Sequence, residues 1–215
     1  RSPGHYEAVL AGFRAGDIRI LLGTQMIAKG LDFPNVRLVG VISADTALNL
    51  PDFRSTEKTF QLIVQVSGRA GRGDEPGRVL VQTFNPEHLA IQLAIRGDYL
   101  AFVRQELPDR QSSSYPPFQK LTRIIIRAKE ESTAREGAKQ IADQLRTTAQ
   151  GWKDVIIKGP APAPVTKLRD YFRFHIQFHT TDARTREKLL ELTIDRLQLP
   201  SAIEFAVDVD PVDLL

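Results

Sequence analysis

The sequence predicts an open α/β domain followed by a small ferredoxin-like α+β domain, and three observations support this. In the first half, continuous apolar runs alternate with helical patterns, as in a parallel sheet covered on both faces. The second half follows the order β-α-β-β-α-β of a ferredoxin-like fold. A stretch rich in Ser and Pro at 108–117 separates the halves, so we expect domains at 1–110 and 111–215.

The first domain is expected to begin with an amphipathic helix. Ser2 can cap this helix, Pro3 suits its first position, and Gly16 is placed to end it. The apolar runs that follow do not alternate with polar residues, which indicates strands buried on both faces. The further elements expected are strands at 18–22, 36–43 and 78–84 and a helix at 57–66.

Another helical pattern precedes the domain boundary. Asn85 is placed to cap this helix and Pro86 to occupy its first position. The pattern runs to about Leu107, with a break expected at Gly97. The Ser/Pro-rich stretch then follows, and we expect it to be a linker between the domains.

The second domain carries helix and strand signals of its own. Thr133 and Glu136 fit a capping box for a helix that Gly151 is expected to end. Residues 171–179 alternate strictly, with phenylalanines on one face and Arg173, the histidines and a glutamine on the other. Further strands are expected at 121–128, 154–158 and 203–209, and a further helix at 184–197.

Composition limits the class of protein. The 215 residues are 42% hydrophobic with a net charge of +3, so a nucleic-acid partner is permitted but not demanded. No apolar run reaches the ~18 residues of a membrane span, and the start lacks the apolar stretch of a signal peptide. Cysteine is absent, which excludes disulfides, thiolate zinc sites and a cysteine nucleophile. We therefore expect a cytoplasmic protein without membrane association.

The loop from Gly23 to Val36 lies between two predicted strands, where open α/β sheets bind ligands. The turn at Gly23 and Thr24 exposes a backbone N–H and a hydroxyl, which both suit phosphate. Gly30 allows close approach, and Asp32 can accept hydrogen bonds from a ribose or hold an arginine. Taken alone, the stretch fits an ordinary βα loop equally well.

Residues 65–73 read Gln-Val-Ser-Gly-Arg-Ala-Gly-Arg-Gly. Arg69 and Arg72 are three residues apart and share a face if the turn is helical. Gly68 and the glycines beyond it leave both guanidinium groups uncrowded. Paired arginines of this kind neutralise the charge that develops on a transferred phosphoryl group. In isolation, this stretch also fits a solvated Arg/Gly turn.

The two stretches together resemble the fifth and sixth motifs of superfamily 2 helicases: a strand, G-T-Q-x-x-x-K-G-x-D, a second strand and Q-V-x-G-R-A-G-R. Further similarity, to the PriA family of replication-restart helicases, lies at residues 39–45, 51–57, 159–164, 171–174 and 208–211. The resemblance covers nearly the whole chain. It implies that the first domain is the C-terminal part of a second RecA-like lobe with trailing helices.

The resemblance also implies roles for individual residues. Arg69 and Arg72 would sense the γ-phosphate of ATP, with Arg72 as the arginine finger and Gln65 supporting them. The residues implied to lie near the nucleotide are Gly30, Asp32 and Gly68. The residues implied to touch the DNA backbone are Thr24 and Gln25.

The resemblance implies partners as well. The whole protein would bind stalled forks and single-stranded DNA, unwind 3′ to 5′ and help to reload the replicative helicase. Its protein partners would be single-stranded-DNA-binding protein and primosome components, and we expect it to act as a monomer.

One motif of an ATPase is absent from the chain, namely the phosphate cradle G-x-x-x-x-G-K-[ST]. The pair Asp74-Glu75 precedes Pro76-Gly77 and indicates a turn rather than a magnesium-binding strand end. By the resemblance, ATP and Mg²⁺ would be held mostly by a first lobe, and zinc-binding cysteines would lie upstream of Arg1. We therefore expect the chain to begin within a domain, to hold no metal and to be inactive alone.

Two weaker signals lie in the second domain. His175 and His179 share a strand face about 13 Å apart, too far for one zinc ion, so we expect surface histidines. Lys167 and Arg169 lie among aromatic residues and are candidates for contact with nucleic acid, the alternative being a solvated loop.

Two other functional classes remain to be weighed. An RNA-recognition module would stack bases on aromatic residues of its open sheet face. That class is disfavoured because the phenylalanines at 172–178 fall on the face that the helices are expected to cover. A non-catalytic nucleic-acid- or protein-binding module built on a degenerate helicase lobe stays open. Upstream sequence with an intact P-loop and zinc cysteines would decide for the enzyme.

Overall fold

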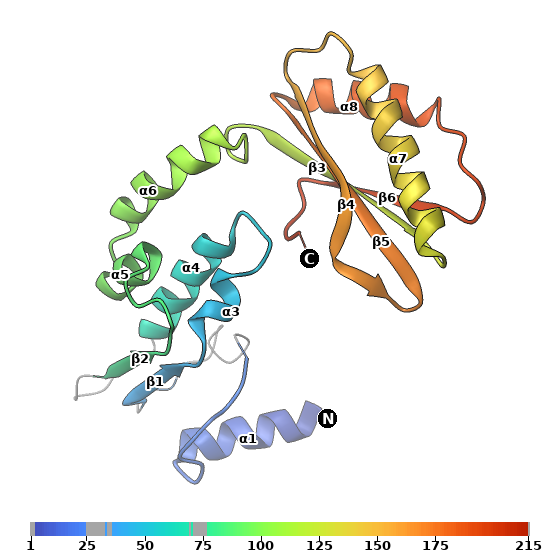
Figure 1. Cartoon of the computed structure of the whole chain (residues 1–215). Helices are drawn as coiled ribbons and strands as arrows, with labels where there is room; N and C mark the ends of the chain where they lie inside the picture. The colour runs from blue at the N-terminus through green and yellow to red at the C-terminus, as the bar shows by residue number, and fades with distance from the viewer. Residues whose placement is uncertain (1–2, 25–32, 34–35, 69, 71–76, 215) are drawn as a thin grey trace. The chain divides into compact units, whose positions relative to one another are not determined.

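The computed structural model describes residues 3–24, 33, 36–68, 70 and 77–214 (Figure 1). It divides into two compact units, Arg1–Leu50 with Arg54–Arg104, and Pro51–Phe53 with Gln105–Leu215. The chain therefore crosses between the units at three points. The last crossing lies six residues before the boundary expected at 110/111. Among the described residues, no helix is long and apolar enough to cross a membrane.

The first unit combines helices with a two-stranded parallel sheet. Helix α1 (Pro3–Ala15) begins at Pro3 as predicted, and Gly16 follows it with a φ of 87°. Strands β1 (Leu38–Val41) and β2 (Arg78–Val81) pair in parallel, as expected. The other elements are α3 (Ala44–Leu48), α4 (Ser55–Ser67), α5 (Leu89–Arg96) and the start of α6 (Tyr99–Ser112).

Helix α4 carries the core of the first unit. Phe60, Ile63 and Val66 lie on one face of α4, at helical spacing, and all three are buried. They pack against α5 and against Phe102 of α6, whose ring stacks on Phe60 at 4.3 Å. Gly97 separates α5 from α6 with a φ of 66°, which confirms the predicted break.

The predicted strand at 18–22 was wrong. Ile20 and Leu22 are 76% and 79% exposed, and no strand forms there. A strand needs backbone partners, and among the described residues of this unit only β1 and β2 pair. The expectation that this sheet is covered on both faces was also wrong, because Leu38 of β1 and Leu80 of β2 remain mostly exposed.

The predicted helix start at Asn85 and Pro86 was also wrong. Helix α5 begins at Leu89, and His88 caps it by accepting a hydrogen bond from the Ala90 N–H. Pro86 and Glu87 form a turn instead, in which the His88 N–H donates to the carbonyl of Asn85 at 3.1 Å. Asp45 holds the residues before this turn by accepting bonds from the Thr83 hydroxyl and the Phe84 N–H. These side-chain bonds compete with helix formation.

The second unit has the predicted ferredoxin-like architecture. Its elements are β3 (Lys120–Ala128), α7 (Glu131–Thr148), β4 (Val155–Leu168), β5 (Tyr171–Thr180), α8 (Ala183–Ile194) and β6 (Glu204–Val209). The strands form one sheet in the order β4-β5-β3-β6, and all neighbours are antiparallel. Helices α7 and α8 lie beside this sheet (Figure 1).

The alternation predicted for β5 is confirmed. Phe174, Ile176 and Phe178 are buried and form one cluster with Ile141 of α7 and Leu189 of α8. The phenylalanines therefore face the helices rather than the open side of the sheet. This arrangement leaves no exposed phenylalanine platform on β5 of the kind that an RNA-recognition module uses.

Three boundaries in the second half differ from expectation. Helix α6 continues through Pro108 to Ser112, supported by an ion pair between Arg110 and Glu106 at 3.0 Å. Helix α7 begins at Glu131, before the expected capping box, and its cap residue makes no side-chain bond. Strand β4 is 14 residues long and includes prolines, which an edge strand tolerates because one side needs no N–H donors.

We expect residues 105–215 to fold in isolation, because their main core cluster lies entirely within them. Urea unfolding followed by Trp152 fluorescence is expected to show one cooperative transition. Its midpoint should lie below that of the same unit in the whole chain, because the contacts of residues 51–53 are lost. A broad transition without cooperativity would show that this unit does not fold alone.

Candidate functional site

The structure describes some of the residues predicted to serve ATP and DNA. The predicted residues that it describes are Thr24, Gln65, Gly68, Lys167 and Arg169. The predicted residues outside the described part are Gln25, Gly30, Asp32, Arg69 and Arg72. The described residues fall into one group in each unit.

Gln65 and Gly68 meet at the C-terminal end of α4. The N–H of Gly68 donates to the carbonyl of Val64 at 3.1 Å, and the Ser67 hydroxyl donates to the carbonyl of Ile63 at 2.7 Å. Burial of Ile63 fixes this last turn against the core. The candidate arginine motif therefore follows directly, in sequence, from a helix end with a defined position in the first unit.

Thr24, which was predicted to touch the DNA backbone, is exposed. It lines a cavity of about 990 Å³ together with residues of β1 and with Val66 of α4. The cavity walls are mainly aliphatic, with hydroxyls from Thr24, Ser43 and Thr46. Thr24 and the end of α4 thus border the same cavity within the first unit.

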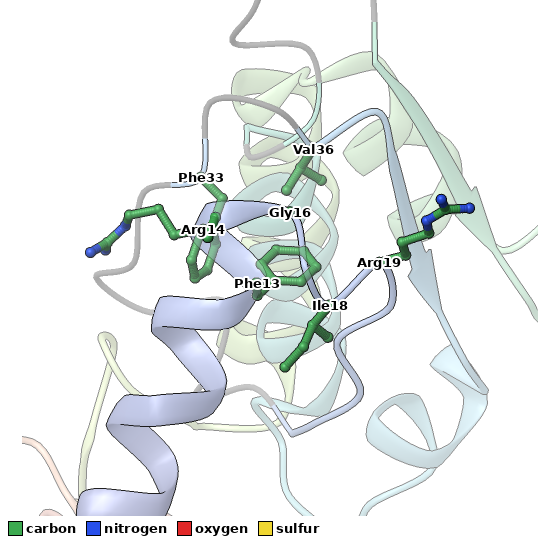
Figure 2. A pocket seen from close by; sticks show the side chains of 8 residues that line it. Phe13, Arg14, Gly16, Ile18, Arg19, Phe33 and Val36 are labelled. Carbon is green, nitrogen blue, oxygen red and sulfur yellow. The ribbon is translucent and has the colours of Figure 1, made fainter.

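Phe33 packs against the end of α1. Its ring meets Phe13 edge to face at 4.9 Å, and the guanidinium of Arg14 lies 5.8 Å from its centroid. These residues line a cavity of about 240 Å³ at the end of α1, from which Arg14 and Arg19 extend in opposite directions (Figure 2). No sequence pattern predicts this aromatic contact, although Phe33 directly follows Asp32.

Lys167 and Arg169 lie together at the tip of the β4–β5 hairpin. Arg169 and Asp170 have φ values of 46° and 62°, as a type I′ turn requires at both central positions. The Lys167 ammonium lies 4.8 Å from the ring of Phe172. Both cations are exposed, so this tip can contact a phosphate backbone.

The open face of the sheet carries three arginines near the hairpin. Arg127 and Arg173 are directly opposite each other on β3 and β5, an unfavourable pairing of like charges. Arg127 bonds Glu204 at 2.6 Å, and Arg123 bonds Asp208 at 2.8 Å. Burial, together with these two arginines, lowers the pKa of Arg173. Two of the three charges are therefore balanced by β6 within the fold.

The histidines are not the surface residues that we expected. His179 is fully buried, and its Nδ1 lies 2.6 Å from the carbonyl oxygen of Ser114. Tyr115 covers it edge to face at 5.2 Å. Strand alternation could not reveal this, because the covering residues come from before β3. Among the described residues, no group of three or more potential ligands could hold a metal ion.

Burial and charge perturb both histidines. Burial and the nearby Lys158 lower the pKa of His179 to about 4, although the bond to Ser114 opposes the shift. Burial, with Arg123 and Arg173, lowers the pKa of His175 as well. Both imidazoles are therefore neutral near pH 7, which makes this part of the sheet less positive than its sequence indicates.

Sequence patterns also predict no individual role for Asp52, Phe53 and Tyr115. Residues 51–53 belong to the second unit, where Phe53 stacks on Tyr115. Burial and the charge of Asp52 raise the pKa of Tyr115. The only sequence signal for this contact was the family similarity at residues 51–57.

Comparison with known proteins gives two family matches along the chain. Residues 111–212 match the family described as "Primosomal protein N C-terminal domain", and residues 1–74 match "Helicase conserved C-terminal domain". Similar proteins include "Replication restart protein PriA" of Bacillus subtilis, at 48% identity over 80% of this chain and 21% of that protein. The protein of the same name from Treponema pallidum is 40% identical over 99% of this chain and 32% of its own length. The chain thus spans between a fifth and a third of these relatives.

We expect the second unit to lose stability between pH 6.5 and pH 4. Because the pKa of His179 is lowered on folding, the unfolded chain binds a proton at this residue below pH 6.5 while the folded chain stays neutral there until about pH 4. The contribution of the neutral, buried His179 to the free energy of unfolding is therefore complete above pH 6.5. The loss is on the order of 2–3 kcal/mol. Urea unfolding of the chain at several pH values, followed by Trp152 fluorescence, measures it.

His179→Gln should flatten most of this pH dependence, with a smaller remainder from His175. His5→Gln, in the other unit, is the matched control and should keep the full dependence. An unchanged pH profile in His179→Gln would show that another group is responsible.

Proposed function

Since the chain belongs to the PriA family, we propose that it forms part of an ATP-dependent DNA helicase that restarts replication at stalled forks. The order of the two family matches carries this proposal, because a helicase domain is followed by a primosomal C-terminal domain. We further propose 3′ to 5′ unwinding, binding of forks and single strands, and assembly of primosome components. The proposed setting is the bacterial cytoplasm, with the protein acting as a monomer beside single-stranded-DNA-binding protein.

The proposed role of the first unit is to sense ATP. Helix α4 ends in a packed turn that bears Gln65 and Gly68, next to the arginine motif in sequence. Arg69 and Arg72 would stabilise the charge that spreads over the γ-phosphate oxygens during transfer. The printed sequence has no P-loop, so ATP and Mg²⁺ would be bound chiefly by another lobe, and this chain alone would not hydrolyse ATP. Zinc would likewise be bound elsewhere in the protein.

The proposed role of the hairpin tip is to contact the DNA backbone. Lys167 and Arg169 are exposed cations at one turn, and the arginines of the neighbouring sheet face are largely balanced by acids. Contacts of this kind position a strand without reading its sequence. Binding through the tip is therefore expected to be sensitive to salt and indifferent to base sequence.

Arg72→Ala in the full-length protein is expected to lower DNA-stimulated ATP hydrolysis by on the order of 10³-fold. Arg72→Lys should recover little, because an ammonium cannot reproduce the planar fork of a guanidinium. DNA affinity without nucleotide should barely change. Arg78→Ala removes an exposed arginine of β2 and is the matched control.

Normal hydrolysis by both Arg72 variants would favour the other class of function, a non-catalytic binding module on a degenerate lobe. An equal loss of DNA binding would instead assign Arg72 to DNA or to folding. Measuring both quantities on one preparation separates these outcomes.

The double variant Lys167→Gln/Arg169→Asn is expected to weaken single-stranded DNA binding by about 3- to 10-fold. Its logarithmic salt slope should fall by about 1–1.5, since each phosphate contact on a single strand contributes roughly 0.7. Asparagine is chosen because it tolerates the left-handed turn at position 169. The control Lys129→Gln/Lys139→Gln removes two positive charges elsewhere on this unit. If the control weakens DNA binding as much as Lys167→Gln/Arg169→Asn does, the effect comes from net charge and not from the hairpin tip.

A further inference from the structure

The four-stranded sheet of the second unit has two edges, and they differ in how well they can accept a further strand. Strand β4, at one edge, contains Pro160, Pro162 and Pro164, and its pairing with β5 shifts register twice. Prolines lack the N–H that strand pairing needs, and irregular register bends an edge away from a partner. Strand β6, at the other edge, contains no proline and pairs with β3 without any shift. Of these two edges, only that of β6 is regular.

The outer side of β6 carries a row of backbone groups with no strand beside them in the described part of the chain. The Asp210 N–H donates to the carbonyl of Leu121, the residue directly opposite, at 3.0 Å. Since hydrogen-bonded pairs alternate along an antiparallel ladder, the even-numbered residues of β6 bond to β3. The N–H and C=O groups of Phe205, Val207 and Val209 therefore point outward, and the described residues supply no backbone partner for them.

The side chains along this edge divide into an apolar face and an acidic face. Phe205 and Val207 pack against the core under the helices, and Val209 beyond them is 44% exposed. The carboxylates of Glu204 and Asp208 lie on the open face, four residues apart, with side chains 46% and 37% exposed. A strand added beside β6 would place its own side chains alternately on these two faces.

Both acids are bonded from the inner side, by arginines of β3. Arg127 donates to Glu204 and Arg123 donates to Asp208. The bond from Arg127 lowers the pKa of Glu204, so this carboxylate is charged near pH 7. Directly opposite residues of neighbouring strands have Cβ atoms about 5 Å apart, so an incoming strand would set one side chain against each carboxylate. Opposite charges stabilise such pairs and like charges destabilise them, so the edge favours a strand with basic residues four positions apart.

A second copy of this chain is a poor occupant for the same reason. In an antiparallel pair of two β6 strands, the outward-pointing residues must pair with one another, which limits the possible registers. The two registers with the longest overlap set carboxylates against each other, with Glu204 opposite either Asp208 or Asp210. The same carboxylates repel phosphate, which disfavours nucleic acid as the occupant.

We propose that the outer edge of β6 binds an extended segment of another protein, which adds to the four-stranded sheet as a further strand. The segment has basic residues four positions apart, facing Glu204 and Asp208, and apolar residues at the alternate positions, beside Val207 and Val209. Backbone hydrogen bonds supply affinity in this mode of recognition, and the side chains on each face supply specificity. The inference goes beyond the proposed function and does not depend on the contact proposed between the hairpin tip and DNA.

The probe is the synthetic peptide Thr-Val-Lys-Val-Thr-Val-Lys-Val-Thr, blocked at both ends and titrated into the whole chain. Its lysines lie four positions apart on one face when the peptide is extended. Saturable binding is expected, with NMR shift changes concentrated on β6 and slower amide hydrogen exchange at Phe205, Val207 and Val209. The same peptide with Glu in place of Lys should bind about 10-fold more weakly, since like charges then face the carboxylates of β6.

Three variants test the edge itself. Val209→Pro removes an outward N–H without removing a bond to β3, and it is expected to weaken peptide binding by about 5- to 10-fold. Val209→Thr keeps the N–H and the branched shape and is the matched control. Glu204→Gln removes one carboxylate and should weaken binding by about 2- to 5-fold. None of the three should weaken binding of single-stranded DNA.

Absence of saturable binding, equal binding of the acidic peptide, or unchanged exchange of the β6 amides would overturn the inference. These three results come from the unaltered chain, so they hold even if Val209→Pro fails to fold. A folded Val209→Pro variant with full affinity would show that the peptide does not pair with this edge. Dimerisation of the chain in sedimentation experiments that Val209→Pro abolishes would assign the edge to a second copy instead.

Discussion

The two-sided character of β5 is the constraint on which the second unit depends. Its even-numbered residues Phe174, Ile176 and Phe178 are buried under the helices, and each contributes about 1.5–3 kcal/mol by leaving water. Since successive side chains of a strand point to opposite faces, this burial forces Arg173, His175 and His179 onto the other face. A slip of one residue would bury the charges and expose the core.

The same constraint extends from β5 to Tyr115 and Phe53, which also belong to the second unit. His179 is held where Tyr115 can cover it, Tyr115 supports Phe53, and Phe53 precedes α4 in the chain.

The net charge of +3 for the whole chain does not show where the second unit is positively charged. Arg123 and Arg127 are balanced by acids of β6, and the two histidines are kept neutral by burial and neighbouring cations. Lys167 and Arg169 are instead exposed at the hairpin tip, where the backbone of Arg169 is left-handed. Contact with a polyanion is therefore proposed there and not across the sheet.

The amino-acid sequence by itself determined the ferredoxin-like unit, the approximate span of α4, the break at Gly97 and the two helicase-like motifs. Each of these depends on the spacing of apolar residues or on residues adjacent in the chain. Tertiary structure decided what depends on partners distant in sequence. Residues 18–22 are apolar but gain no strand partner, and Asp45 binds Thr83 and Phe84 ahead of a turn where a helix start was predicted. Tyr115 buries a histidine that strand alternation placed at the surface. The stacking of Phe53 on Tyr115 could not be predicted, because it depends on which rings the fold brings together and not on their spacing in the sequence.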